Sequence, residues 1–212
     1  MTETQLREIL VESGIDLLKS NLVQGTWGNT SVRLDEKSML VTPSGLDYLS
    51  LKPEDMAKVD INTLEWEGKY KPTSEKGIHA GVYSARKEVG AVIHSHPTYC
   101  SVFASAHIPL PVINDKMKNL IGGEVRVSGY GLPGSSKLCK NTLIGLDGRN
   151  ATFMANHGVL CVGKDMKEAF EIMATMEECC KLYIEQMTCK ITGEKEFTQE
   201  ILDNFFIKNF SK

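Results

Sequence analysis

The chain has 212 residues, of which 42% are hydrophobic and 24% are charged, and its net charge at neutral pH is −3. This composition is that of an ordinary soluble protein, and the small charge gives no electrostatic reason to expect nucleic acid or an anionic membrane surface as a partner. The length suits one globular domain spanning residues 1–212.

Targeting signals and disulfide patterns are not evident in the sequence. No apolar run approaches the roughly 18 residues of a membrane helix, and Met1–Gln5 lacks the basic-then-apolar order of a signal peptide. The six cysteines contain no C-x-x-C pair, and a chain of this size folds without cross-links. We therefore expect a cytoplasmic protein with reduced thiols and no membrane partner.

The N-terminal part of the chain predicts a helix followed by two polar loops around a hairpin. Apolar residues recur at helical spacing over residues 4–22. The segment Gln24–Ser31 is rich in glycine, asparagine and hydroxyl side chains, which suit a phosphate-binding loop but are equally common in simple turns. The runs Ser31–Leu34 and Met39–Val41 predict a hairpin that brings this loop near a second small-residue turn at Thr42–Gly45.

The next predicted helix opens after Lys71 and runs to about Arg86. Thr73 or Ser74 is the expected N-cap, and Glu75 falls in the first turn. A glutamate at that position is ordinary helix-dipole chemistry, so Glu75 alone indicates no function.

Two histidines follow a short apolar strand in the middle of the chain. The run Ala91–Ile93 predicts a buried strand, and side chains two positions apart on a strand lie on the same face. His94 and His96 therefore point together, as two ligands of a zinc-type site would. A catalytic site of that kind needs one or two further ligands and an open position.

Helices and one short strand are expected after this motif. Asn114–Ile121 predicts a helix, a strand is expected near Glu124–Val127, and Ser135 or Ser136 caps a helix to about Leu146.

A third histidine lies between two later strands. The apolar runs Ala151–Ala155 and Val159–Val162 flank a break that contains His157. Taken alone, such a histidine is either a structural residue or a metal ligand.

The C-terminal part predicts two helices. Residues 165–188 form the longest, with a broad apolar face typical of a core or a subunit contact. The tail from Thr198 is a second amphipathic helix, too apolar to stay in water, so it should pack on its own chain or on a neighbour.

Taken in order, five short motifs resemble those of the class II aldolase and adducin family. The resemblance covers residues 5 to about 190, and it is strongest to the L-fuculose 1-phosphate aldolase branch of that family. The motifs are Gly25-Thr26-Trp27-Gly28-Asn29-Thr30-Ser31-Val32-Arg33, Thr42-Pro43-Ser44-Gly45, Lys71-Pro72-Thr73-Ser74-Glu75, Ile93-His94-Ser95-His96-Pro97 and Asn156-His157-Gly158.

The resemblance implies a metal site and a phosphate site. It implies that His94, His96 and His157 bind the metal ion. Glu75 would lie on the metal in the resting site and act as acid and base once substrate displaces it. The implied phosphate cradle consists of Thr26, Asn29, Ser44, Gly45, Thr73 and Ser74.

It also implies a fold and an assembly. The expected fold is α/β, with three α-β-α layers and a central, mostly antiparallel sheet flanked by helices. The expected assembly is a homotetramer with active sites at subunit interfaces.

The implied reaction fits these residue types. A divalent cation held by three neutral imidazoles keeps enough charge to act as a Lewis acid. The family activity is cleavage of a ketose 1-phosphate to dihydroxyacetone phosphate and an aldehyde through a metal-stabilised enediolate. Zn²⁺ is the expected metal, and Mn²⁺ or Co²⁺ would also suit three histidines and a carboxylate.

The sequence departs from the fuculose phosphate aldolases on the aldehyde side of the site. Those enzymes carry a tyrosine before the position of Gly122, where this chain has none. Lys116 or Asp115 is the candidate replacement proton donor, although both also fit a solvent-facing helix, and Tyr130 is a weaker candidate. Their C-terminal tyrosine is also missing, and phenylalanines take its place. We therefore expect a sugar phosphate whose non-phosphorylated half is not that of fuculose.

Other activities remain open on the same scaffold. An epimerase, a dehydratase or a decarboxylase of a related sugar phosphate would need the same metal and phosphate sites. Adducin-like members without the ligand set are non-catalytic interaction modules, and the complete set here argues against that role.

Overall fold

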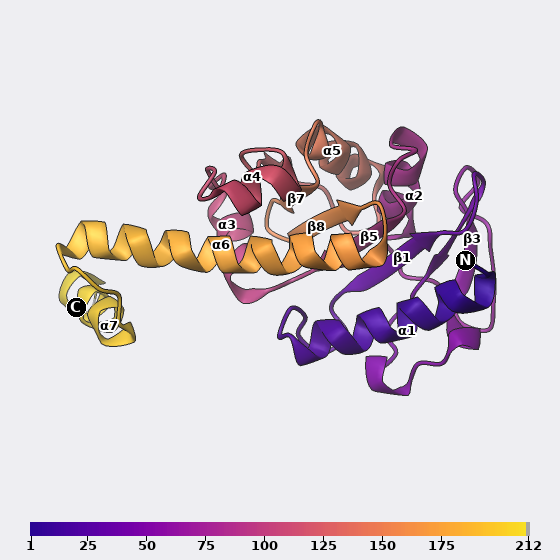
Figure 1. The fold of residues 1–212 in the computed structure, drawn as a ribbon, viewed down its shortest axis with the longest axis horizontal. Coiled ribbons are helices and arrows are strands. Elements are labelled where there is room, and N and C mark those ends of the chain that lie inside the picture. The colour runs from indigo at the N-terminus through magenta and orange to yellow at the C-terminus, as the bar shows by residue number, and fades with distance from the viewer. Residues whose placement is uncertain (211–212) are drawn as a thin grey trace.

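The computed structural model describes residues 1–210, and its centre is an eight-stranded sheet with helices on both faces (Figure 1). The strand order is β4-β3-β2-β1-β5-β8-β7-β6, and every neighbouring pair is antiparallel except the parallel pair β6–β7. This confirms the predicted α/β class and the mostly antiparallel sheet. The strands are β1 (Asn29–Arg33), β2 (Ser38–Val41), β3 (Ala57–Asp60), β4 (Trp66–Glu67), β5 (Ala91–Ser95), β6 (Val127–Ser128), β7 (Ala151–Met154) and β8 (Gly158–Gly163).

Two apolar clusters, one on each face of the sheet, make the three layers. The helices are α1 (Glu3–Lys19), α2 (Lys76–Ala85), α3 (Thr98–Ala106), α4 (Asp115–Ile121), α5 (Ser136–Leu146), α6 (Met166–Thr192) and α7 (Gln199–Phe210). Residues of α1, α3, α4 and α6 form the first cluster, and residues of α2 and α5 form the second. Ile93 of β5 joins the first cluster and its neighbour Val92 joins the second. Because β5 is covered on both faces, it is buried along its whole length rather than alternating between buried and exposed.

The register of β1 places the predicted loops at one end of the sheet. β1 pairs with β2 with Ser31 opposite Val41, as the predicted hairpin requires, and with β5 with Asn29 opposite His94. The end of β5, the loop before β1 and the turn after β2 therefore lie together.

The start of α2 differs from the prediction. Its N-cap is Glu75, without a side-chain cap bond, and neither Thr73 nor Ser74 caps it. The Thr73 backbone N–H donates to the Thr42 carbonyl at 3.2 Å, which ties this residue to the turn after β2. The Thr73 hydroxyl accepts the N–H of Glu75, only two residues on, so the helix begins later, at Lys76. The strand expected at Glu124–Val127 is also shorter and forms at Val127–Ser128.

The C-terminal helices extend away from the sheet. Figure 1 shows α6 running beyond the body of the chain, with α7 beside its far end. α7 has no fully buried residue, so packing on its own chain covers its apolar side only in part. None of the helices within residues 1–210 is long and apolar enough to cross a membrane.

Candidate metal centre

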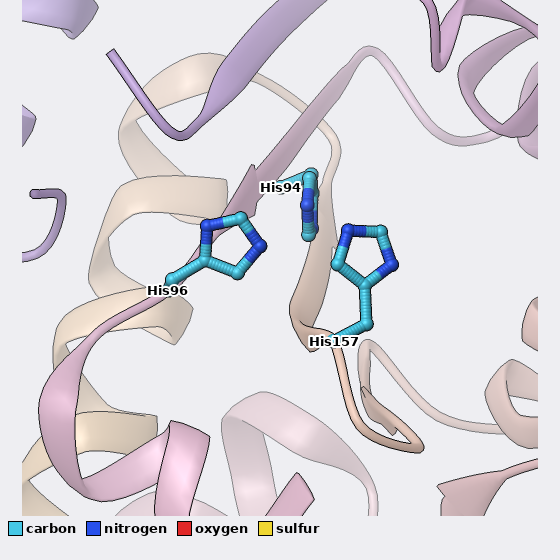
Figure 2. Close-up of side chains that lie close together, drawn as sticks. All are labelled: His94, His96 and His157. Carbon is cyan, nitrogen blue, oxygen red and sulfur yellow. The ribbon is translucent and has the colours of Figure 1, made fainter. Parts of the chain in front are cut away.

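Three histidines from separate segments converge at the end of β5. His94 is the fourth residue of β5, His96 follows that strand, and His157 lies in the turn between β7 and β8. Their rings face one another in Figure 2, with centroids 4.7 Å apart for His94–His96 and His94–His157 and 5.3 Å apart for His96–His157. One nitrogen from each ring lies within 4.8 Å of the other two. The fold thus brings together the three histidines singled out in the sequence.

The turn that carries His157 requires specific residues on both sides. Asn156 has a φ of 56°, in the left-handed region that asparagine tolerates better than most residues. A Cβ at Gly158 would lie 2.6 Å from the Ser95 carbonyl oxygen and would overlap the ring of His96. Only glycine therefore lets β8 approach the end of β5 closely enough to bring His157 to the cluster.

Backbone hydrogen bonds determine which ring nitrogens can bind a metal. His94 Nδ1 lies 3.0 Å from the Val159 carbonyl oxygen, and His96 Nδ1 lies 2.5 Å from that of Trp27. A carbonyl oxygen only accepts, so each Nδ1 carries the hydrogen, and each Nε2 keeps a lone pair. This arrangement is the one that metal-bound histidines use.

Glu75 completes the cluster from the start of α2. Its side chain is buried, with Oε2 3.1 Å from His94 Nε2 and Oε1 3.3 Å from His157 Nε2. His94 Nε2 and Glu75 Oε1 are buried and have no hydrogen-bond partner in residues 1–210. A nitrogen lone pair faces a carboxylate oxygen here, and two acceptors attract each other only through a shared proton or cation. The donor set therefore fits a divalent metal ion, which would satisfy these buried atoms.

Two of the three histidines, His94 and His96, are in the form that metal binding needs. Burial is the main cause that lowers the pKa of His94 well below its usual value, and the neighbouring imidazoles add to it. Burial also lowers the pKa of His96, again with a contribution from His157. Both rings are accordingly neutral at pH 7, so a cation does not have to displace a proton from them.

The turns that contain four of the six predicted phosphate residues lie side by side. The Ser44 N–H donates to the Lys71 carbonyl at 2.9 Å, and Pro43 and Pro72 form an isolated β-bridge. Ser44, Gly45 and Ser74 are exposed there, while Thr73 is buried. Thr26 is half-buried in the loop before β1, next to the Trp27 carbonyl that receives the His96 N–H.

Asn29 lies at the centre of the site rather than in an open loop. It is buried, its Nδ2 donates to Glu75 Oε2 at 3.1 Å, and its Oδ1 lies 2.5 Å from Nε2 of His79. The amide nitrogen has a second hydrogen, so the phosphate contact predicted for Asn29 is compatible with this bond. Sequence reasoning missed His79, although its position four residues after Glu75 places it one helical turn farther along α2.

The candidate proton donors are not part of this cluster within one chain. Lys116 and Asp115 are exposed on α4, and the Lys116 ammonium lies 3.9 Å from Glu178 of α6. Tyr130 is 47% exposed, in the loop after β6. Across residues 1–210, the cluster itself therefore consists of the three histidines, Glu75 and Asn29.

A pocket opens beside the histidines. Its volume is about 370 Å³, and it is lined by Gln24, Trp27, His96, Thr98, Ser101 and His157. The Trp27 side chain is 70% exposed. A small molecule in this pocket would meet two of the three histidine rings.

Comparison with known proteins shows which family the chain matches. The family model for the class II aldolase and adducin N-terminal domain matches residues 8–184. A 5-methylthioribulose-1-phosphate/5-deoxyribulose-1-phosphate aldolase of Rhodospirillum rubrum is 33% identical over 84% of this chain and 80% of its own length. A 5-deoxy-D-ribulose 1-phosphate aldolase of Bacillus thuringiensis is 31% identical over 92% of this chain and 90% of its own. Among solved structures, an L-fuculose 1-phosphate aldolase superposes with a TM-score of 0.83 at 32% identity, covering 96% of this chain and 95% of the other.

Proposed function

Because the chain belongs to the class II aldolase and adducin family, we propose that it is a metal-dependent aldolase that cleaves a ketose 1-phosphate to dihydroxyacetone phosphate and an aldehyde. The observation that carries this proposal is the buried carboxylate of Glu75 facing the lone pair of His94, with His157 Nε2 3.3 Å from its other oxygen. A non-catalytic adducin-like module would have no reason to bury such a set without neutralising it.

His94, His96 and His157 would hold the cation, with Glu75 as a further ligand before substrate binds. When bound, the cation supplies Lewis-acid stabilisation of the negative charge that develops on the ketose oxygens as the C3–C4 bond breaks. Zn²⁺ is the first candidate, and Mn²⁺ or Co²⁺ suits the same donors.

Glu75 would move the proton on the ketose side of the reaction. Cleavage removes a proton from the C4 hydroxyl and returns one to C3, and Glu75 would supply the C3 proton. Lys116 or Asp115 of a neighbouring copy, both exposed on α4, would accept the C4 hydroxyl proton as the aldehyde forms and would donate it to the aldehyde oxygen in the reverse condensation.

The paired turns at Ser44–Gly45 and Thr73–Ser74, with Thr26 and Asn29, would bind the phosphate. Their hydroxyls and backbone N–H groups suit an anion, and a fixed phosphate aligns the C3–C4 bond with the reacting groups. Binding energy from the phosphate is thereby used to orient the bond that breaks.

The proposal extends to the non-phosphorylated half of the substrate. The sequence lacks the tyrosine expected of a fuculose phosphate aldolase before Gly122. Two relatives at 33% and 31% identity are named for 5-deoxyribulose 1-phosphate, and one of them also for the methylthio analogue. We therefore place ribulose 1-phosphates with an apolar C5 substituent first among the substrates to test.

The assembly proposed is a homotetramer with active sites at subunit interfaces. Its support within one chain is the apolar side of α7, where Phe206, Ile207 and Phe210 are 53%, 61% and 68% exposed. Apolar side chains gathered on one helix are normally covered, and a second copy of the chain is the partner that a homo-oligomer supplies.

Metal analysis combined with a substrate screen tests this function. The protein would be purified without added metal, assayed by mass spectrometry for Zn²⁺, Mn²⁺ and Co²⁺, and incubated with ketose 1-phosphates while dihydroxyacetone phosphate release is followed. We expect about one metal ion per chain and release from a 5-deoxy or 5-methylthio pentulose 1-phosphate. Protein that gains no metal from any of the three salts would disprove the proposal, and an isomeric sugar phosphate as sole product would make it an epimerase.

A further inference from the structure

A continuous chain of buried hydrogen bonds runs from the core to Glu75. Tyr83 Oη lies 2.9 Å from Ser31 Oγ, which lies 2.6 Å from His79 Nδ1. On the other side of the ring, His79 Nε2 lies 2.5 Å from Asn29 Oδ1, and Asn29 Nδ2 lies 3.1 Å from Glu75 Oε2. All five side chains are buried, and Ser31, His79 and Tyr83 are fully so.

The chemistry of Glu75 determines the direction of every bond in this chain. An ionised carboxylate only accepts, so the nitrogen of the Asn29 amide faces it and the amide oxygen faces His79. The oxygen also only accepts, so His79 donates from Nε2, and its Nδ1 must accept from Ser31. Ser31 in turn accepts from Tyr83. Each member has one assignment, and each bond depends on the next.

His79 remains neutral in this setting, as that assignment requires. Its ring is fully buried, which lowers its pKa to about 3, with the nearby His94 contributing in the same direction. A protonated ring would donate from both nitrogens and would leave Ser31 without its acceptor.

We propose that His79 is a positioning residue: by fixing the orientation of the Asn29 amide, it aims the Glu75 carboxylate at the metal site. Without its Nε2–H, the Asn29 amide could turn its oxygen toward Glu75, where two acceptors would repel. The proposal rests on the metal site of the proposed function and adds a residue that does not touch the metal. Groups that orient metal ligands typically change metal affinity by about 10- to 100-fold.

Cobalt binding to the metal-free, full-length protein tests the role without relying on turnover. Co²⁺ affinity would be measured against a competing chelator, and the visible absorption of the bound ion would report its coordination. We expect His79→Asn, which keeps a polar group near Ser31 but cannot reach Asn29, to weaken Co²⁺ binding about 10- to 100-fold and to change the visible bands. The longer His79→Gln can again donate to Asn29 and should restore affinity to within about threefold.

Two further variants separate positioning from simple loss of stability. Thr142→Val removes an equally buried hydroxyl on α5 and should leave Co²⁺ binding unchanged. Ser31→Ala removes the donor to His79 Nδ1 with little loss of volume, and it should weaken Co²⁺ binding in the same direction as His79→Asn.

The outcomes are distinct. Wild-type affinity and bands in a folded His79→Asn protein would overturn the inference while leaving the metal site intact. If His79→Asn does not fold, unchanged binding by Ser31→Ala overturns it instead. A wild-type protein that binds no Co²⁺ overturns the proposed function, and this inference with it.

Discussion

At the scale of single residues, His94 and Glu75 lie in one cluster, but replacing each should have a different effect on metal content and turnover. His94→Ala removes a neutral ligand and leaves Glu75 buried beside a gap, so we expect bound metal and turnover to be lost together. Glu75→Gln keeps three imidazoles and an oxygen donor, so most of the metal should remain. Its turnover should fall by about 10²- to 10⁴-fold, the usual contribution of an acid–base group. Metal content by mass spectrometry and turnover on the same samples check both.

Glu54→Gln is the matched control for this pair, because Glu54 is an exposed carboxylate. It should change neither metal content nor rate. A Glu75→Gln protein with full activity would remove Glu75 from the mechanism.

His79 also makes the stability of the metal-free protein depend on pH. Its pKa is about 3 in the folded chain and near 6.5 when unfolded, so between these values the unfolded chain binds a proton that the folded chain does not. The free energy of unfolding therefore falls as the pH falls below 6.5, by up to about 1.4 kcal/mol per pH unit from this group. Urea unfolding at pH 7, 6 and 5 should give a shallower decline for His79→Gln. Equal slopes would show that His79 titrates normally.

At the scale of elements, the β7–β8 turn should be intolerant of any side chain at Gly158. An alanine Cβ there would overlap the His96 ring, so Gly158→Ala should displace a ligand and reduce bound metal. Gly193 is the control: it has a φ of 79°, but a Cβ there meets nothing within 4 Å. Gly193→Ala should cost about 1 kcal/mol of stability through backbone strain alone and leave metal content unchanged. Normal metal content in Gly158→Ala would contradict the close-approach argument.

Most elements are predictable from the sequence because their apolar spacing is local. The hairpin of β1 and β2, the strand at Ala91–Ile93, the helix near Asn114–Ile121 and the cap Ser135 all follow from patterns within a few residues. The cap of α2 was predicted wrongly, because a backbone bond from Thr73 to Thr42 in a distant turn overrides the local preference.

The candidate site was predictable only in part, for a related reason. The three histidines stand out because each follows or interrupts an apolar strand. His79 lies among apolar residues of α2, and a buried histidine there looks like any core residue until its contacts with Asn29 and Ser31 are known. Spacing in the sequence does not reveal such cross-element bonds.

At the scale of the whole molecule, a single chain leaves the helix α7 largely uncovered and Lys116 outside the histidine cluster. α6 has 27 residues and is about 40 Å long at 1.5 Å per residue. It carries α7 away from the sheet, where no residue of α7 is buried. Lys116 is exposed on α4, with Glu178 as its charged neighbour. A homotetramer would account for both, by covering α7 and by bringing Lys116 to a neighbour's histidines.

Mixed assemblies test whether one site draws residues from two copies. Lys116→Ala and Glu75→Gln chains, carrying different tags, would be produced together and the doubly tagged species purified. Each variant alone should be nearly inactive if Lys116 transfers the proton on the aldehyde side. In the mixture, a site is complete when an intact Glu75 meets an intact Lys116 from the next copy. Random assembly makes about one quarter of the sites complete, so activity should recover to about a quarter of wild type.

Co-assembly of Glu75→Gln with His94→Ala is the control, because both residues belong to the same chain's cluster. No copy then has both His94 and Glu75 intact, so activity should not recover, although light scattering should give the same assembly size. If the Lys116→Ala and Glu75→Gln mixture stays at the mean of the two variants, Lys116 acts within its own chain or not at all. Full activity of Lys116→Ala alone would show that Lys116 has no catalytic role and is a surface residue whose charged neighbour is Glu178.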